Sequence, residues 1–260
     1  MRYALCYSPD ERSSLWQQLC IWLGRNPATG KTGAQPQFSD IEPDRLTELT
    51  RSPRRHGPCA VLKAPFRLAA GRTPQMLDKT LELFCYRHRP ISLPPLAITD
   101  IRNTFCLAPA ETAEDVLHFA DRCVRRFEPF RAPLTPLETA RRRAAILCRE
   151  ERRSLALWGY PWACETYRFL IPLTGRIADA MEKRRVLNAI TRTFDGLLDN
   201  PPPLGDIALF VEQEPGRPFV LQKRFPLTAT PLPGEPATGS DRLQPPATRQ
   251  FPAGIFLNEE

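Results

Sequence analysis

Histidine is scarce in this chain, with only three among 260 residues. None of the three, His56, His88 and His118, has an acidic residue or a cysteine beside it at the spacing of a catalytic triad or a metal site. Surface or structural roles are therefore favoured for all three. The sequence gives no indication of catalysis by a local histidine cluster.

Long apolar runs are absent as well, since no uninterrupted apolar segment approaches the roughly 20 residues of a membrane-spanning helix. The first residues predict a strand and a polar turn, without the apolar stretch of a secretory signal. The eight cysteines are spread out, so no C-x-x-C pair of the zinc-site kind occurs. We expect a cytoplasmic protein with reduced cysteines, no membrane contact, no metal and no cofactor.

What is present suits a folded, basic protein. With 42% hydrophobic residues, the chain can bury a sizeable core, as one domain or as two joined lobes. The net charge of +7 permits contact with phosphate or nucleic acid but does not require it. An arginine-rich stretch indicates a solvated helix face with local ion pairs to Glu150 and Glu151, the alternative being an anion or RNA surface. Its members are Arg141, Arg142, Arg143, Arg149, Arg152 and Arg153.

Two stretches, 59–68 and 169–177, follow one plan. Each is a short apolar strand that runs into a turn, then a predicted helix and two further strands. After the first, Thr73 and Pro74 begin a helix, and a hairpin turns at Arg102 and Asn103. After the second come a helix whose apolar stripe includes Leu187 and a strand pair joined by a turn at 214–217. The repeat of strand, helix, strand and strand predicts an α+β protein.

Other segments carry local signals. Ser13 or Ser14 can cap a helix that ends near Gly24, and a helix capped by Thr112 is predicted between the two repeats. A proline-rich and polar passage, with no predicted element, extends to Pro58. We divide the chain into a bilobal domain, 1–225, and a proline-rich tail, 226–260, which has too few apolar residues to fold alone and is expected to be flexible, with only 254–257 docking.

The segment GRNPATGKTG, 24–33, superficially resembles a phosphate-binding P-loop. That motif needs four residues between its glycines and a position between a strand and a helix. Here five residues separate Gly24 from Gly30, a predicted helix precedes them, and no helix start follows. A surface loop is the favoured interpretation.

Four longer segments carry a family resemblance: RYALCYSP, RRHGPCAVLKAPFRL, CVRRFEPFRAPLTPLETARRR and WGYPWACETYRFLIPLTG. Together they resemble uncharacterised proteins of phosphonate-utilisation operons, a branch of the 2H phosphoesterase superfamily, over roughly Arg2 to Phe225. The resemblance implies a two-lobed, pseudo-twofold α+β fold, with antiparallel sheets lining a central cleft and helices outside. It also implies cleavage of phosphodiesters or cyclic phosphates by two His-x-Thr motifs, one in each lobe.

This sequence departs from both motifs. Where the family pattern is H-A-T-L-K-A-P-F, the histidine and threonine become Cys59 and Val61; where it is F-H-x-T-L-T-G, they become Leu170 and Pro172. In the motif strands, near 59–66 and 168–175, strict alternation places three polar side chains on the face of the lost groups. These candidate ligand-binding residues are Lys63, Arg168 and Thr174. Pro172 would remove a ladder donor from an expected inner strand, which predicts a local break or bulge there.

A positioned general acid or base contributes roughly 10²- to 10⁴-fold to a rate, so the loss of both predicts an inactive protein, a pseudoenzyme. The expected function is a binding or accessory role in phosphonate metabolism, with a phosphorylated small molecule or a protein as partner. Two alternatives stay open. One is an active cyclic-phosphate or phosphodiester hydrolase that uses other residues, such as Cys59 as a nucleophile; the other, less favoured, is an RNA-binding module.

Overall fold

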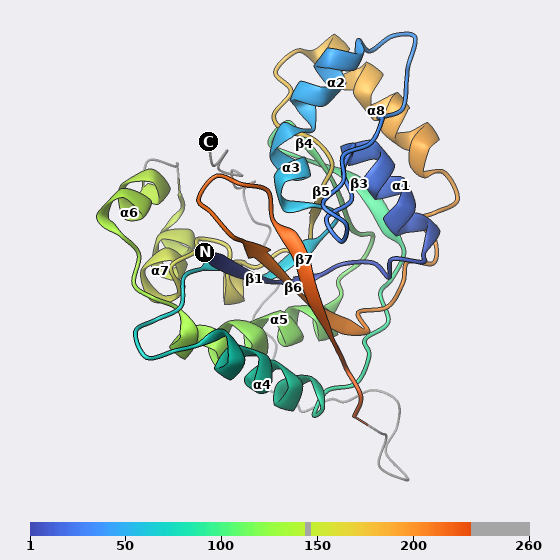
Figure 1. Cartoon of the computed structure of the whole chain (residues 1–260). Coiled ribbons are helices and arrows are strands. Elements are labelled where there is room, and N and C mark those ends of the chain that lie inside the picture. Colours follow the sequence, from blue (N-terminus) through green and yellow to red (C-terminus); the bar gives the residue numbers. More distant parts are fainter. Residues whose placement is uncertain (144–146, 230–260) are drawn as a thin grey trace.

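The computed structural model describes residues 1–143 and 147–229, and it has the predicted α+β class with antiparallel sheets (Figure 1). The strands are β1 (Arg2–Tyr7), β2 (Ala60–Phe66), β3 (Leu96–Ile101), β4 (Thr104–Pro109), β5 (Ile171–Pro172), β6 (Asp206–Glu212) and β7 (Val220–Pro226). The helices are α1 (Ser14–Leu23), α2 (Pro43–Leu49), α3 (Arg51–His56), α4 (Pro74–Cys85), α5 (Glu114–Phe127), α6 (Pro136–Arg143), α7 (Arg149–Trp158) and α8 (Ala180–Phe194). Two short 3-10 helices, η1 (Glu128–Phe130) and η2 (Cys164–Thr166), complete the order.

The repeat predicted from the sequence is present, because β2, α4, β3 and β4 follow the same order as β5, α8, β6 and β7. The two units nevertheless exchange strands. The four-stranded sheet has the order β2-β1-β6-β7 and the three-stranded sheet has the order β3-β4-β5. Each sheet therefore combines the first strand of one unit with the hairpin of the other, an arrangement that is compatible with the predicted two-lobed fold.

Several local predictions are confirmed by the geometry of the element ends. The Ser13 hydroxyl accepts a hydrogen bond from the Trp16 amide at the start of α1, and Thr73 does the same for Met76 at the start of α4. Arg102 and Asn103 have φ values of 51° and 68°, the left-handed conformation that a two-residue hairpin turn requires at both positions.

Other local predictions are wrong. The helix expected from Thr112 begins at Glu114, and its N-cap residue, Ala113, has no side chain that can cap. The passage before Pro58 contains α2 and α3, and Pro43 occupies the first turn of α2, where its missing N–H costs nothing. Leu187, expected on the apolar side of α8, is 37% exposed.

The folded body includes the first residues assigned to the tail. Pro226 ends β7, Leu227 is buried, and the amides of Thr228 and Ala229 donate to carbonyl oxygens at the C-terminus of α4. The remainder of the predicted tail, 230–260, including the segment 254–257 that was expected to dock, lies outside the described residues.

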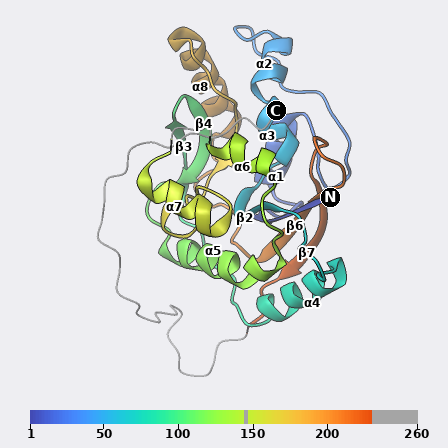
Figure 2. The same cartoon turned by 90° about the vertical axis from the view of Figure 1, so that its left-hand side faces the viewer.

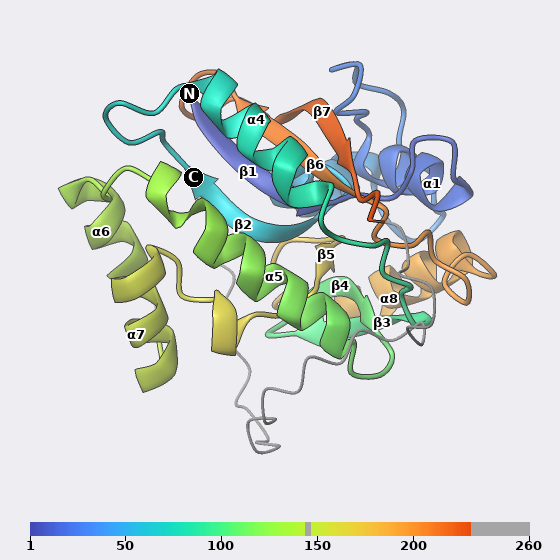
Figure 3. The same ribbon diagram turned by 90° about the horizontal axis from the view of Figure 1, so that it is seen from below.

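One large core joins the two sheets. Helices α4 and α5 cover one face of the four-stranded sheet, as Figure 3 shows from below, and they contribute Leu77, Leu81 and Phe127 to this core. A small hydrophobic cluster lies on the opposite face of the four-stranded sheet and is formed by side chains at alternate strand positions. It consists of Ala4, Cys6, Cys59, Ala208, Phe210 and Phe219, with Val61 and Leu221 packed against it.

Helices α6 and α7 lie next to each other on one side of the four-stranded sheet. This helix pair faces the viewer in Figure 2. Among residues 1–143 and 147–229, no helix is long and apolar enough to cross a membrane.

Candidate functional site

The first motif position is buried in apolar surroundings. Cys59 precedes β2 and is 2% exposed, within the small cluster. Its hydrogen-bonding neighbours in the described part of the chain are the His56 carbonyl oxygen, 3.8 Å away, and the Cys6 thiol. Burial, and to a smaller extent Cys59, raises the pKa of Cys6 well above its ordinary value. Neither neighbour is a base of the kind that activates a thiol nucleophile.

The three histidines lie apart from each other. The His56 ring stacks on Phe219 with centroids 5.4 Å apart, His88 makes a hydrogen bond from Nδ1 to the Phe84 carbonyl, and His118 is exposed on α5. Burial lowers the pKa of His88. These positions agree with the surface or structural roles predicted for the three residues.

The second motif lies on an edge strand, which corrects the expectation that Pro172 interrupts an inner one. Among the described strands, β5 pairs with β4 alone, through Ile171 and Pro172. A proline is tolerated at a sheet edge because its missing N–H removes no ladder hydrogen bond there. After Pro172 the ladder breaks as predicted, since the amides of Leu173 and Thr174 both donate to the Phe105 carbonyl oxygen.

The remaining polar groups of this strand differ in their availability. Thr174 is 1% exposed, and its hydroxyl accepts a hydrogen bond from the Phe105 amide at 3.0 Å, which is a structural use of that group. Arg168 is half-buried, as are Leu170 and Pro172. The two motif strands, β2 and β5, contact each other. That Arg168 and Thr174 bind a ligand stays a prediction.

Lys63 does not share a face with Val61, contrary to the alternation expected. Val61 is opposite Cys6 in β1 and Lys63 is opposite Leu5, with an irregular register between these pairs. Leu5 and Cys6 are consecutive residues that point to opposite faces of the sheet, so Val61 and Lys63 do too. The bulge therefore turns Lys63 toward α5.

On that side Lys63 is 4% exposed and well bonded. Its ammonium donates to the Val124 carbonyl oxygen at 3.2 Å and to Glu128 Oε2 at 2.8 Å. Burial lowers the pKa of Lys63, and the carboxylate of Glu128 opposes this effect. Glu128 is 65 residues away from Lys63 in the sequence, so no local sequence pattern indicates this ion pair.

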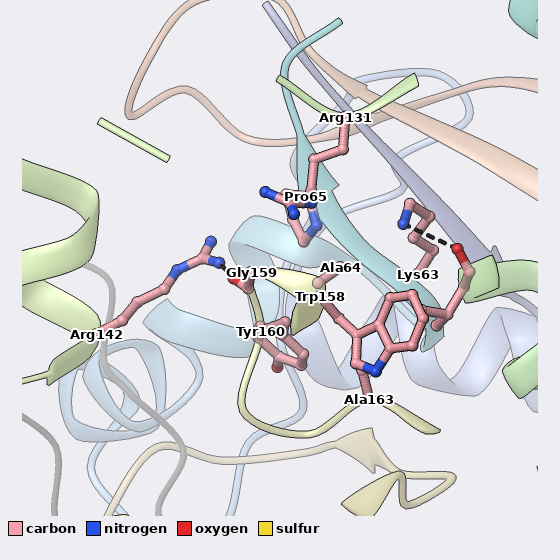
Figure 4. A pocket seen from close by; sticks show the side chains of 10 residues that line it. Lys63, Ala64, Pro65, Arg131, Arg142, Trp158, Gly159, Tyr160 and Ala163 are labelled. Carbon is pink, nitrogen blue, oxygen red and sulfur yellow. Dashed lines mark hydrogen bonds between the residues drawn. The ribbon is translucent and has the colours of Figure 1, made fainter. Parts of the chain in front are cut away.

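Around Lys63 lies a pocket, hereafter the basic pocket, drawn in Figure 4. Its volume of about 10 Å³ is space for about one water molecule. It is formed by β2, α5, the end of α6 and the turn after α7. The lining residues are Lys63, Ala64, Pro65, Val124, Arg131, Arg142, Trp158, Gly159, Tyr160 and Ala163.

Cations predominate at the basic pocket. Glu128 Oε1 accepts hydrogen bonds from Arg131 Nη2 and Nε at 2.5 and 2.9 Å, while its other oxygen accepts from Lys63. Arg142 is buried, donates to the Gly159 carbonyl oxygen and lies 5.7 Å from the Tyr160 ring centre. Three cationic side chains thus belong to the lining of the pocket, and a positive potential there favours an anion.

Gly159 permits this arrangement. It ends α7 with a left-handed φ of 67°, and a Cβ atom there would lie 2.8 Å from Arg131 Nη1. Only glycine combines that conformation with so close an approach.

The sequence alone did not indicate Glu128 or Arg131 as site residues, and it indicated Arg142 only as a member of the arginine-rich stretch. The only signal was their position, because all three lie in the segment CVRRFEPFRAPLTPLETARRR that carries the family resemblance.

The arginine-rich stretch is not one solvated face. Arg142 is buried, and buried Glu151 accepts hydrogen bonds from the Cys148 amide and the Trp162 indole. Arg152 and Arg153 are exposed on α7. The side chains of Arg141 and Arg143 lie outside the described residues.

The fold and site define an α+β protein with two interlocked antiparallel sheets and a basic pocket beside its first motif strand. Over residues 61–220 the chain matches the family described as "Protein of unknown function (DUF1045)", and it belongs to that family.

Two curated relatives are similar over most of this chain. It is 34% identical over 230 residues to the ribose 1,5-bisphosphate phosphokinase PhnN of Janthinobacterium sp. (strain Marseille), which covers 87% of this chain and 51% of that protein. It is 32% identical over 223 residues to the protein of the same name from Laribacter hongkongensis (strain HLHK9), covering 85% and 50%. The chain thus spans about half the length of these relatives.

Proposed function

We propose that this chain is an accessory protein of phosphonate metabolism with a 2H phosphoesterase-like fold, which binds a phosphorylated small molecule without hydrolysing phosphodiesters. The observation that carries the proposal is the basic pocket, whose lining includes three cationic side chains, Lys63, Arg131 and Arg142. The exchange of strands between two repeated units supports the pseudo-twofold fold. The name PhnN of both relatives supports the phosphonate context.

Catalytic silence follows from the chemistry at the four motif positions. Cys59, Val61, Leu170 and Pro172 supply no imidazole and no hydroxyl, and Cys59 lies in an apolar cluster. The two proton transfers implied by the family motifs each need an imidazole, and these positions hold none. Lys63 and Glu128 already form an ion pair and serve binding in this proposal.

We assign the kinase activity in the name of the relatives to the half of those proteins that this chain does not match. The segment 24–33 follows α1 and closes on itself through a bridge between Arg25 and Thr32, and no helix begins directly after it within the described residues. A phosphate-binding loop needs a strand before it and a helix after it. In this proposal the chain binds a phosphorylated sugar, the class of compound named for the relatives.

We expect ribose 5-phosphate to bind the protein and the substitution Lys63→Met to weaken this binding about 10- to 100-fold. The reason is that a hydrogen bond to a charged group contributes about 1.5–3 kcal/mol, and 1.4 kcal/mol is tenfold in affinity. Isothermal titration calorimetry measures the effect. Lys223→Met is the matched control. Lys223 lies on the edge strand β7, is 44% exposed and pairs with Asp78 and Glu82 of α4, outside the basic pocket. Equal affinity in both variants, or no binding by the unaltered protein, contradicts the proposal.

We also expect no turnover of a 2′,3′-cyclic phosphate above the buffer rate, because both proton-transfer groups are lost. Phosphorus NMR over a day of incubation detects the product. The comparison is between the unaltered protein, Cys59→Ala and Cys6→Ala, the last of which removes a neighbouring buried thiol. Turnover that disappears only in Cys59→Ala would establish a cysteine-based hydrolase instead.

A further inference from the structure

Among the lining residues of the basic pocket, Lys63 alone carries a primary amine (Figure 4). The residue is 4% exposed, and its Nζ donates to the Val124 carbonyl oxygen and to Glu128 Oε2. Lysine amines that react with carbonyl groups are typically desolvated or placed beside another cation. Lys63 meets both conditions, because it is buried and the guanidinium of Arg131 acts on it.

The pocket reaches solvent at lining residues that are only half-buried. These residues are Ala64, Pro65, Arg131, Trp158 and Tyr160. The enclosed space is about 10 Å³, room for about one water molecule, whereas the pocket together with the open space at its mouth measures about 270 Å³. The body of a sugar phosphate can therefore lie at the mouth while its carbonyl group reaches toward Lys63.

We propose that Lys63 forms an imine with the open-chain aldehyde of an aldose phosphate, so that the pocket captures its ligand covalently and reversibly. The inference rests on the proposed function, which supplies the phosphorylated sugar, and it adds a chemical activity at Lys63. It also adds a requirement for a free aldehyde. A sugar phosphorylated at C1 has none, so ribose 5-phosphate is selected over ribose 1,5-bisphosphate.

The amine must lose a proton before it can attack a carbonyl carbon, and its surroundings favour this loss. Burial lowers the pKa of Lys63 and outweighs the charges of Glu128 and Cys164, which raise it, while the charge of Arg131 lowers it further. Three other titratable or charged groups lie near Lys63 or in the pocket lining. They are Cys123 on α5, Arg142 on α6 and Tyr160 after α7.

Imine formation needs no further reagent. Glu128 is not part of the pocket lining, but its Oε2 lies 2.8 Å from Nζ and can take one proton from the ammonium. The nitrogen lone pair then attacks C1 of the aldehyde, and a proton passes from nitrogen to the former carbonyl oxygen. That oxygen leaves as water when the C=N bond forms, on taking up the proton that Glu128 returns through the solvent. One ammonium and one aldehyde thus give one iminium ion and one water molecule.

The test is reductive trapping with ribose 5-phosphate and cyanoborohydride, followed by peptide mass mapping. The adduct adds to Lys63 the mass of one sugar phosphate less one oxygen atom. We expect Lys63 to be modified at least about tenfold faster than Lys79 at pH 7, although the side chain of Lys79 is 71% exposed. The reason is that a pKa lowered by one unit raises the fraction of free amine about tenfold.

Three controls separate imine formation from ion binding. Ribitol 5-phosphate carries the phosphate but no aldehyde, and it should give no adduct. Lys63→Arg keeps a cation at this position and should lose the adduct there, whereas Lys223→Met should keep the adduct on Lys63. The third control is the pH profile, in which adduct formation on Lys63 should level off at a lower pH than on Lys79. Mapping of the unaltered protein decides the result even if Lys63→Arg folds poorly.

The outcomes separate the two proposals. Calorimetric binding of ribose 5-phosphate, with adducts that follow side-chain exposure and leave Lys63 slowest, overturns the imine and leaves the proposed function standing. Preferential modification of Lys63 by ribose and ribose 5-phosphate alike, without calorimetric binding, overturns the proposed function while the reactive lysine stands. Neither binding nor an adduct on Lys63 overturns both. Preferential modification of Lys63 that depends on the phosphate supports both.

Discussion

Replacing Glu212 by alanine is expected to lower the free energy of unfolding by about 3–5 kcal/mol, because it leaves buried cations without a partner. The Glu212 side chain on β6 is fully buried and accepts hydrogen bonds from Arg2 on β1, Arg55 on α3 and the Gly216 amide. Arg2 and Arg55 are only 16% exposed. The carboxylate thus joins two strands, a helix and a turn.

Urea unfolding followed by circular dichroism measures this loss. The control is Glu214→Ala in the adjacent turn. The Glu214 side chain is 74% exposed and pairs with an equally exposed Arg217, so the expected change is within about 0.5 kcal/mol. A loss below about 1 kcal/mol in Glu212→Ala would contradict the structural role given to this carboxylate.

The same group gives stability a pH dependence. Burial alone would raise the pKa of Glu212, but hydrogen bonds from Arg2 and Arg55 outweigh it and hold the pKa below its ordinary value. A carboxyl with a depressed folded pKa stabilises the protein above its unfolded pKa of about 4.3, and this contribution is lost as the pH falls through the folded value. The free energy of unfolding, measured at several pH values between 3 and 6, should therefore fall more steeply with falling pH in the unaltered protein than in Glu212→Gln.

The second large effect is expected at Trp22, which supports the other motif strand. This side chain of α1 is fully buried, lies 6.1 Å from the rings of both Phe38 and Phe194, and donates from its indole to the Leu173 carbonyl oxygen at 2.9 Å. Trp22→Ala should cost about 3–5 kcal/mol of the free energy of unfolding, because it leaves a cavity that the packed core cannot fill.

Two further variants divide this cost. Trp22→Phe keeps an aromatic ring but leaves the Leu173 carbonyl oxygen without its indole donor, for a smaller loss than alanine causes. Ile21→Ala, at the neighbouring position that is 46% exposed, should change stability by about 0.5 kcal/mol or less. If Trp22→Ala were no worse than Ile21→Ala, the packing described between α1, α8 and β5 would be wrong.

The sequence by itself determined the local elements, because their causes are local. Ser13 and Thr73 cap helices, Arg102 and Asn103 turn a hairpin, and the strand-helix-strand-strand order appears twice. The α+β class followed from these elements. The replacement of both His-x-Thr motifs is also a statement about residue types alone, and it carries the prediction of catalytic silence.

Only the tertiary structure decided how the two units share strands, where Lys63 points and what surrounds it. Strand exchange depends on pairing between segments as distant as β1 and β6, which no local pattern specifies. A single bulge in β2 reverses the face of Lys63, since side chains alternate with a period of two and any irregularity shifts those beyond it. The basic pocket joins Lys63, Arg131, Arg142 and the end of α7, and these come together only when β2, α5, α6 and α7 pack against one another.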